Sequence, residues 1–167
     1  MHDELTEVDI KKMQEEIAYR KSVLTPKLKE DLKAARELGD LSENDEYRSA
    51  KRELNRNYSR IRYLTSMIDT AVVIQSNSSA DTVGLFDHVT LRYDEDDEEE
   101  TVTIVTTLRT DVLNGYISKE SPVGKALLGH KAGDRVLIKV NDTNSYYVTI
   151  TALAKGSDDD SLEIAKY

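Results

Sequence analysis

Two acidic residues, Asp40 and Glu43, stand three positions apart in a short stretch between two helical patterns. Carboxylates in such a stretch can cap the following helix, because they accept hydrogen bonds from free backbone N–H groups at its N-terminus. They can also donate oxygen atoms to Mg²⁺, which keeps several waters and usually takes one or two protein carboxylates. Both interpretations stay open, and they are compatible, because a cap can hold the acids in place.

Two exposed carboxylates on one turn do not make a complete metal site. Their Mg²⁺ shell could be completed only inside the site of another protein. Elsewhere the sequence has no cysteine, no glycine-rich phosphate loop and no serine paired with a base, and its histidines lack ligand-like spacing. We therefore expect no self-contained active site and no cofactor bound to the isolated protein.

The first helical pattern runs from Ile10 to Leu38, where apolar residues recur at helical spacing. Thr6 and Asp9 precede it as an N-cap and its reciprocal carboxylate. Pro26 interrupts the pattern and is expected to kink the axis, because it removes one backbone hydrogen bond. The helix is expected to stop at Gly39, a residue suited to a left-handed terminator.

A second helix is predicted from about Ser42 to Thr70, with Asp40 or Ser42 as its N-cap. Its seam has heptad spacing with one polar insertion, at Asn57. Because the connection is very short, the two helices must run antiparallel. About 30 residues in each would give a hairpin roughly 45 Å long, with the acids at its tip. We assign residues 1–75 to this coiled-coil hairpin.

The period changes to two after Ala71, as expected for a small antiparallel sheet. A short helix is predicted from Pro122 to about Leu128, and the acidic run 94–100 is expected to be a solvated hairpin loop. The expected class is therefore α+β, with a sheet domain at 76–155 and a solvated acidic tail at 156–167. The candidate strands are 71–75, 85–93, 101–108, 135–140 and 145–153.

The charge is unevenly distributed along the chain. Residues 1–75 carry 14 Lys and Arg against 15 Asp and Glu, whereas residues 76–167 carry 9 against 17. An acidic C-terminal half argues against wrapping of duplex DNA and favours a protein partner with a basic surface. No stretch approaches membrane-spanning length, so we expect a cytoplasmic monomer that does not bind membranes.

Basic residues gather on the second helix behind the acidic tip. Arg48, Arg52, Arg56 and Arg60 recur every four residues, with Lys51 beside them. One interpretation is a solvated face that favours the helix. The other is a surface for RNA, since arginine pairs bidentately with phosphate; for that role we select Arg48, Lys51, Arg52 and Arg56.

The tip motif ARELGDLSENDEY at 35–47 resembles the tip signature of the Gre family of bacterial transcription elongation factors. A second motif, SPVGKALLG at 121–129, also resembles that family, and the resemblance spans roughly residues 5–153. One departure is Asp45, which stands where the family usually has a small residue.

The resemblance implies a coiled coil that enters the secondary channel of bacterial RNA polymerase, followed by an FKBP-like domain. It implies that Asp40 and Glu43 help to hold a shared Mg²⁺ while the polymerase cleaves backtracked RNA near the 3′ end of the transcript. The protein would then be an accessory factor and not itself an enzyme. Glu120, Ser121 and Pro122 match the segment that docks on polymerase, although Pro122 also suits the first position of a helix.

Two other functions remain open. Some Gre-like proteins inhibit polymerase instead of stimulating cleavage, and an extra tip acid such as Asp45 is compatible with that. An FKBP-like isomerase or chaperone would need an aromatic-lined pocket, and this chain has no Trp and only one Phe. The first alternative is separated from the main hypothesis by a cleavage assay on a backtracked polymerase.

Overall fold

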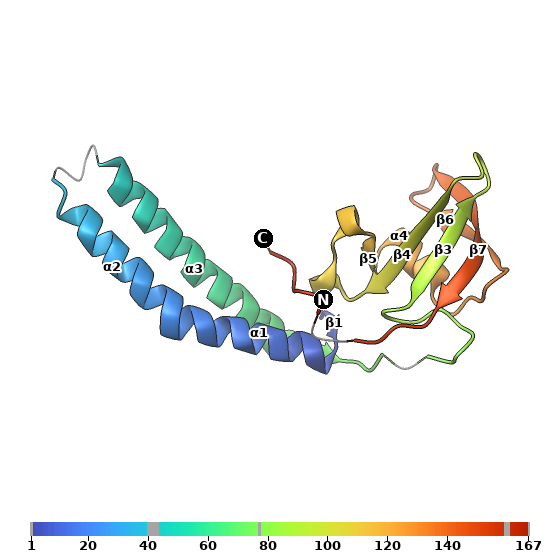
Figure 1. The fold of residues 1–167 in the computed structure, drawn as a ribbon, viewed down its shortest axis with the longest axis horizontal. Coiled ribbons are helices and arrows are strands. Elements are labelled where there is room, and N and C mark those ends of the chain that lie inside the picture. Colours follow the sequence, from blue (N-terminus) through green and yellow to red (C-terminus); the bar gives the residue numbers. More distant parts are fainter. Residues whose placement is uncertain (1, 40–43, 77, 159–160, 167) are drawn as a thin grey trace. The chain divides into compact units, whose positions relative to one another are not determined.

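The computed structural model describes residues 2–39, 44–76, 78–158 and 161–166. The chain divides into two compact units. Residues 10–71 form the helical unit, and residues 1–9 together with 72–167 form the sheet unit. Figure 1 shows the long helices of the first and the curled sheet of the second, which is the expected α+β class. The division differs from the predicted domains, because residues 1–9 and 72–75 are grouped with the sheet and the predicted tail is not a separate unit.

The N-terminal residues of the sheet unit form a short parallel ladder. Strand β1 (Glu4–Leu5) pairs with β2 (Val72–Val73), and Leu5 is fully buried. Helix α1 (Glu7–Tyr19) follows at once. Its start carries the predicted capping box: the Thr6 N–H donates to Asp9 Oδ2 at 3.0 Å, and the Asp9 N–H donates to Thr6 Oγ1 at 3.3 Å.

The first arm of the helical unit is not one continuous α-helix. A π-helical turn, η1 (Arg20–Leu24), separates α1 from α2 (Thr25–Arg36). The Thr25 N–H donates to the Arg20 carbonyl, five residues back. This wider turn comes directly before Pro26, which lacks an N–H and whose ring would crowd the carbonyl of a normal α-turn. The axis bends there (Figure 1), so the predicted kink is present and has a π turn as its local structure.

Helix α3 (Asp45–Thr70) forms the second arm. Its N-cap is Asn44, whose side chain accepts a hydrogen bond from the Tyr47 N–H. The predicted caps, Asp40 and Ser42, are therefore wrong, because the helix begins several residues later. On the other side of the connection, α2 ends at Arg36 and Gly39 has a positive φ of 129°.

A polar layer crosses the seam of the helical unit, where the sequence predicted a single polar insertion. Asn57 is 1% exposed, and its amide donates to Thr25 Oγ1 at 2.6 Å and accepts from Arg20 at 3.1 Å. Glu16 binds Arg20 and Arg60 at 2.8 Å each. The layer satisfies buried polar groups only in one alignment of the arms, so it fixes their register.

The sheet unit contains a five-stranded sheet in the order β5-β4-β3-β7-β6. The pairing is antiparallel except between β4 and β5, which run parallel, so the expectation of a purely antiparallel sheet is corrected to a mixed one. Strand β5 was not predicted, and the predicted strand 71–75 is reduced to the two residues of β2. The strands are β3 (His88–Tyr93), β4 (Glu99–Val105), β5 (Tyr116–Ser118), β6 (Arg135–Lys139) and β7 (Ser145–Ala154).

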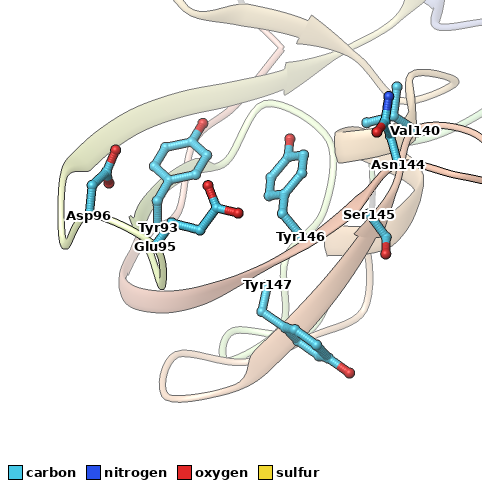
Figure 2. A pocket seen from close by; sticks show the side chains of 8 residues that line it. All are labelled: Tyr93, Glu95, Asp96, Val140, Asn144, Ser145, Tyr146 and Tyr147. Carbon is cyan, nitrogen blue, oxygen red and sulfur yellow. The ribbon is translucent and has the colours of Figure 1, made fainter.

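One face of this sheet carries the core, and helix α4 (Pro122–Leu127) covers part of it with the buried Leu127. Six residues give a helix only about 9 Å long, which is much shorter than β7. Tyr93 and Tyr146 continue the core face and pack against the core residues. Figure 2 shows their rings side by side.

The C-terminal segment was predicted to be a solvated tail, but Asp158 and Ile164 contact the rest of the sheet unit. Asp158 accepts hydrogen bonds from Thr6 and, at 2.8 Å, from the fully buried Arg109. Ile164 is 8% exposed, and the Ala165 N–H donates to the Leu108 carbonyl. Arg109 also lies 2.8 Å from Asp9 and thereby joins the C-terminal segment to the start of α1. Composition suggested solvation, but the charge of Asp158 is paired with a buried guanidinium.

Candidate functional site

The predicted tip acids, Asp40 and Glu43, lie outside the described residues. The structure does describe the two ends of the connection that contains them. The Asn44 amide donates to the Ala35 carbonyl at 2.7 Å, while its oxygen accepts from the Tyr47 N–H at 3.0 Å. One side chain therefore closes the connection by bonding to the last turn of α2 and the first turn of α3.

The surroundings of this closure are charged and aromatic. The Arg36 guanidinium lies 5.7 Å from the ring centre of Tyr47, across the two arms. Asp45 and Glu46 occupy the first turn of α3, where the helix dipole favours negative charge. The Asp45 side chain is 94% exposed and has only a loose ion pair with Arg48, at 3.6 Å. This end of the hairpin therefore carries acids beyond the two predicted ones.

The basic residues of α3 separate into two groups. Arg48, Lys51, Arg52 and Arg56 are exposed, and Arg56 pairs with Glu53 at 3.2 Å. Arg60 is buried and bound to Glu16, so the row does not extend to it. The exposed group therefore occupies the turns of α3 nearest the acidic connection. Exposed guanidinium and ammonium groups of this kind suit contact with a phosphate backbone.

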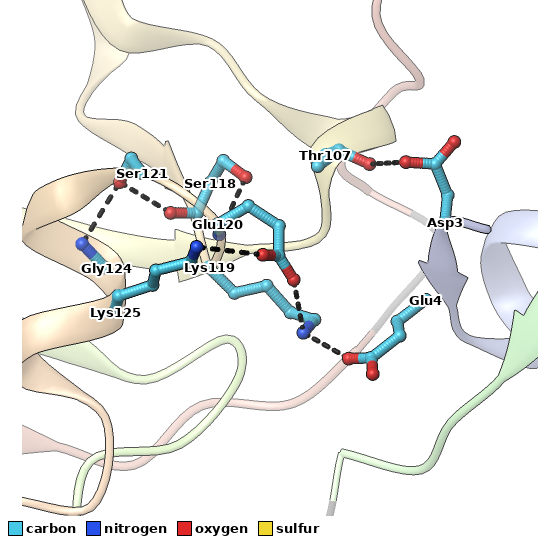
Figure 3. A network of polar contacts seen from close by, with 9 residues as sticks. All are labelled: Asp3, Glu4, Thr107, Ser118, Lys119, Glu120, Ser121, Gly124 and Lys125. Atoms are coloured by element: carbon cyan, nitrogen blue, oxygen red, sulfur yellow. Dashed lines mark hydrogen bonds and ion pairs between the residues drawn. The ribbon is translucent and has the colours of Figure 1, made fainter. Parts of the chain in front are cut away.

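The predicted docking segment lies between β5 and α4. Ser121 caps α4 by accepting from the Gly124 N–H at 3.0 Å, and its hydroxyl donates to the Ser118 carbonyl at 2.6 Å (Figure 3). Pro122 is exposed at the start of α4, as its helix-start interpretation predicts. Gly124 is sterically required, because a Cβ there would lie 2.1 Å from the Ser118 carbonyl oxygen. The fold therefore presents a rigid, exposed corner.

Glu120 belongs to a charged network at this corner (Figure 3). It lies 2.9 Å from Lys119 and 3.7 Å from Lys125, and Lys119 also binds Glu4. The hydrogen bond from Lys119 holds the pKa of the Glu120 carboxyl below its ordinary value. Burial alone would lower the pKa of Lys119, but its bonds to Glu4 and Glu120 outweigh burial and raise it. Glu120 is therefore a fixed anion on an exposed surface.

Among the residues that the structure describes, no group of three or more His, Cys, Asp or Glu side chains is arranged to hold a metal ion. Within the same residues, no helix is long and apolar enough to cross a membrane. The chemistry that these described surfaces offer is therefore ionic: an acidic end, an adjacent basic row and a fixed charged corner.

Comparisons with known proteins cover nearly all of this architecture. The model for the transcription elongation factor N-terminal domain matches residues 4–73, and the model for the GreA/GreB C-terminal domain matches residues 77–155. The transcription elongation factor GreA of Bacillus licheniformis is 42% identical over 136 residues, which cover 81% of this chain and 86% of that protein. The chain belongs to the GreA/GreB family of transcription elongation factors.

The similarity to curated GreA proteins extends along most of the chain. GreA of Oenococcus oeni is 39% identical over 152 residues, covering 90% of this chain and 94% of that protein. A solved structure of the transcription factor Gfh1 shares 24% identity, covers 92% of this chain and 97% of its own, and aligns with a TM-score of 0.45. The family models end at residue 155, so the buried contacts of Asp158 and Ile164 lie beyond them.

Sequence reasoning about this GreA/GreB family member missed two features. The first is the role of Asn44 as the N-cap of α3, which was missed because several neighbouring residues can also cap a helix. The pairing of Tyr93 and Tyr146 was not predicted, although each residue follows the period-two core pattern of its strand. That period was the available signal, because it places both rings on the core face of the sheet.

Proposed function

We propose that this chain binds bacterial RNA polymerase, inserts its helical unit into the secondary channel and stimulates cleavage of backtracked RNA. The observation that carries the proposal is the closed end of the hairpin. There Asn44 ties α2 to α3 around the connection that contains Asp40 and Glu43. A long two-helix arm with acids at one end suits delivery of carboxylates into a narrow site.

In this proposal the factor supplies ligands and the polymerase supplies the rest of the reaction centre. Asp40 and Glu43 would hold a Mg²⁺ that is shared with polymerase and is not bound by the factor alone. Carboxylate oxygens suit this hard cation. When bound, the ion helps to activate water and to stabilise charge at the scissile phosphate. The neighbouring acids Asp45 and Glu46 add negative charge, which favours approach of a cation.

The other exposed charges have separate roles in the proposal. Arg48, Lys51, Arg52 and Arg56 contact phosphates near the 3′ end of the extruded RNA. Glu120, Ser121 and Pro122 dock on the polymerase surface. The rigid cap of α4 and the paired state of Glu120 support the docking role, because a fixed surface loses little conformational freedom on binding.

The test is RNA cleavage by a stalled, backtracked polymerase with and without the full chain. Faster cleavage supports the proposal, and the isolated protein should not hydrolyse RNA with Mg²⁺. The exposed Asp45 favours a second candidate, a factor that binds polymerase and inhibits it. Tight binding with slowed elongation and no added cleavage would select that candidate.

A further inference from the structure

A cavity of about 460 Å³ lies at one end of the sheet unit, beyond the reach of α4. Tyr93 on β3 and Tyr146 on β7 form its wall, with ring centres 5.8 Å apart. Glu95 and Asp96, from the turn between β3 and β4, stand on one rim (Figure 2). Val140, Asn144 and Ser145 line the opposite side. The cavity thus combines aromatic faces with carboxylates.

The opposite face of the same strand shows what this combination binds. Tyr147 also lines part of the cavity, but its side chain points away from that of Tyr146, which precedes it on β7 (Figure 2). The guanidinium of Arg135 lies 3.7 Å from the centre of the Tyr147 ring and 2.7 Å from the Asp94 carboxylate. A tyrosine face and a neighbouring acid from the β3–β4 turn therefore already hold one arginine in this chain.

The cavity also contains tyrosine rings and acids from the β3–β4 turn, but no arginine lines it. None of the residues that line it is Lys or Arg, and no ion pair among the described residues engages Glu95 or Asp96. We propose that this cavity binds an arginine or lysine side chain of a partner protein, with the cation against Tyr93 and Tyr146 and its charge met by Glu95 and Asp96. The inference does not depend on the proposed role in RNA cleavage.

The charge state of the wall supports cation binding. The Tyr93 hydroxyl donates to the Glu100 carboxylate at 2.6 Å. Burial, together with this hydrogen bond, raises the pKa of Tyr93 above its ordinary value, and burial also raises that of Tyr146. Both rings are therefore neutral at physiological pH, and the bond to Glu100 fixes the orientation of the Tyr93 hydroxyl. The surrounding half of the chain has a large excess of acids, which attracts cations over a longer range.

The two carboxylates on the rim also distinguish this site from one that binds a proline ring. An isomerase pocket would bind an uncharged side chain, and charged groups on its rim would add nothing to the binding of an uncharged ring. A cation, in contrast, gains from both the aromatic faces and the acids. Chemical probes of matched shape can therefore distinguish the two occupants.

The experiment is an NMR titration of the full chain that follows the ring signals of Tyr93 and Tyr146, assigned with Tyr93→Phe and Tyr146→Phe. The probes are acetyl-arginine amide, acetyl-citrulline amide, which has the same shape without the charge, and acetyl-proline amide. We expect saturable shifts of both rings with the arginine probe and much weaker ones with the other two. The paired substitution Glu95→Gln with Asp96→Asn should weaken arginine binding about fivefold.

The matched control is Glu7→Gln with Glu163→Gln, which removes two exposed acids of the sheet unit from positions outside the cavity. It should leave arginine binding unchanged. Equal binding of arginine and citrulline would overturn the proposal, as would stronger binding of proline. An equal loss in the control pair would assign the effect to net charge and would also overturn it.

Discussion

The guanidinium Nε of Arg60 lies 2.8 Å from Glu16 Oε2, and this pair joins α3 to α1 inside the helical unit. The Arg60 side chain is only 5% exposed. Its Nη2 also donates to Glu16 Oε1 at 3.2 Å, so the contact is bidentate. The pair shows that the arginines spaced four residues apart on α3 do not all lie on its exposed face, because Arg60 lies in the seam.

The first prediction concerns this pair. Arg60→Ala should lower the free energy of unfolding by about 3 kcal/mol, because it leaves the Glu16 carboxylate partly buried beside one fewer partner. Chemical denaturation monitored by helical circular dichroism measures the change. Arg62→Ala is the matched control, since Arg62 is exposed on the same helix, and it should change stability by about 0.5 kcal/mol or less. Similar losses in both variants would contradict the structural role of Arg60.

The second prediction is a pH dependence at Glu16. Burial alone would raise its pKa, but hydrogen bonds from Arg60 and Arg20 outweigh burial and lower it from the ordinary 4.5. A lowered pKa in the folded state stabilises the fold above the ordinary value and loses that effect as pH falls through the lowered value. The difference in Tm between the wild type and Glu16→Gln should therefore shrink from neutral pH to about pH 3. A constant difference would argue against the charged pair.

The third prediction separates metal donation from capping at the tip. Because Asn44 caps α3, Asp40→Asn and Glu43→Gln should leave stability and polymerase affinity nearly unchanged. Each should reduce stimulated cleavage by orders of magnitude, with partial recovery at high Mg²⁺, because the amides lack the charge that attracts the ion. Transcript cleavage and thermal unfolding are measured on the same variants.

Two controls accompany the tip substitutions. Asp45→Asn, at an exposed acid of the same end, should cost much less cleavage. Asn44→Ala should lower the free energy of unfolding by about 1 kcal/mol, because α3 loses its N-cap. Equal cleavage defects at Asp40, Glu43 and Asp45 would mean that net charge, and not specific ligation, carries the effect.

The fourth prediction concerns the exposed basic row. Arg52→Glu with Arg56→Glu should slow stimulated cleavage at low salt, and the difference from wild type should narrow as salt rises, because screening weakens the phosphate contacts of the wild type. Lys29→Glu with Lys33→Glu, exposed on the other arm, is the charge-matched control. An unaffected cleavage rate in the Arg52 and Arg56 variant would identify the row as a solvated helix face.

The fifth prediction tests the C-terminal segment. Asp158→Ala should lower the free energy of unfolding by about 3 kcal/mol, because Arg109 is fully buried and would lose one of its two carboxylate partners. Denaturation of the full chain measures this. Glu163→Gln, an exposed acid of the same segment, is the control and should have almost no effect. No loss at Asp158 would show that the segment contributes little to the fold.

The helical unit was largely predictable because its helices are long enough for the apolar repeat to recur over many turns. The seam residues, the polar insertion at Asn57 and the break at Pro26 can each be recognised from the spacing of residues within a few helical turns, although Asn57 makes its contacts with the other arm. The start of α3 was misplaced because Asp40, Ser42 and Asn44 all have side chains that can cap a helix, and sequence alone does not choose among them. Arg60 was grouped with the exposed arginines because a spacing of four residues occurs both on an exposed helix face and in the seam between two helices.

The sheet unit was less predictable because its decisive contacts are remote in sequence. Strand β5 has only three residues, too few to show a period of two. Arg109 forms ion pairs with Asp9 and Asp158, which are remote from it in sequence, and no local sequence pattern predicts these pairs. The paired tyrosines required knowledge that β3 and β7 are neighbours in the sheet. The roles of the tip acids and of the docking corner stay predictions.

The pairing of β1 with β2 makes the helical unit an insertion within the sheet unit. Strand β1 is synthesised before the hairpin, yet its partner strand β2 is synthesised only after the whole hairpin. The hairpin consists of adjacent helices with local contacts and can form early. Completion of the sheet unit then has to wait for residues 72 and beyond, so the inserted hairpin can fold before the unit that contains β1.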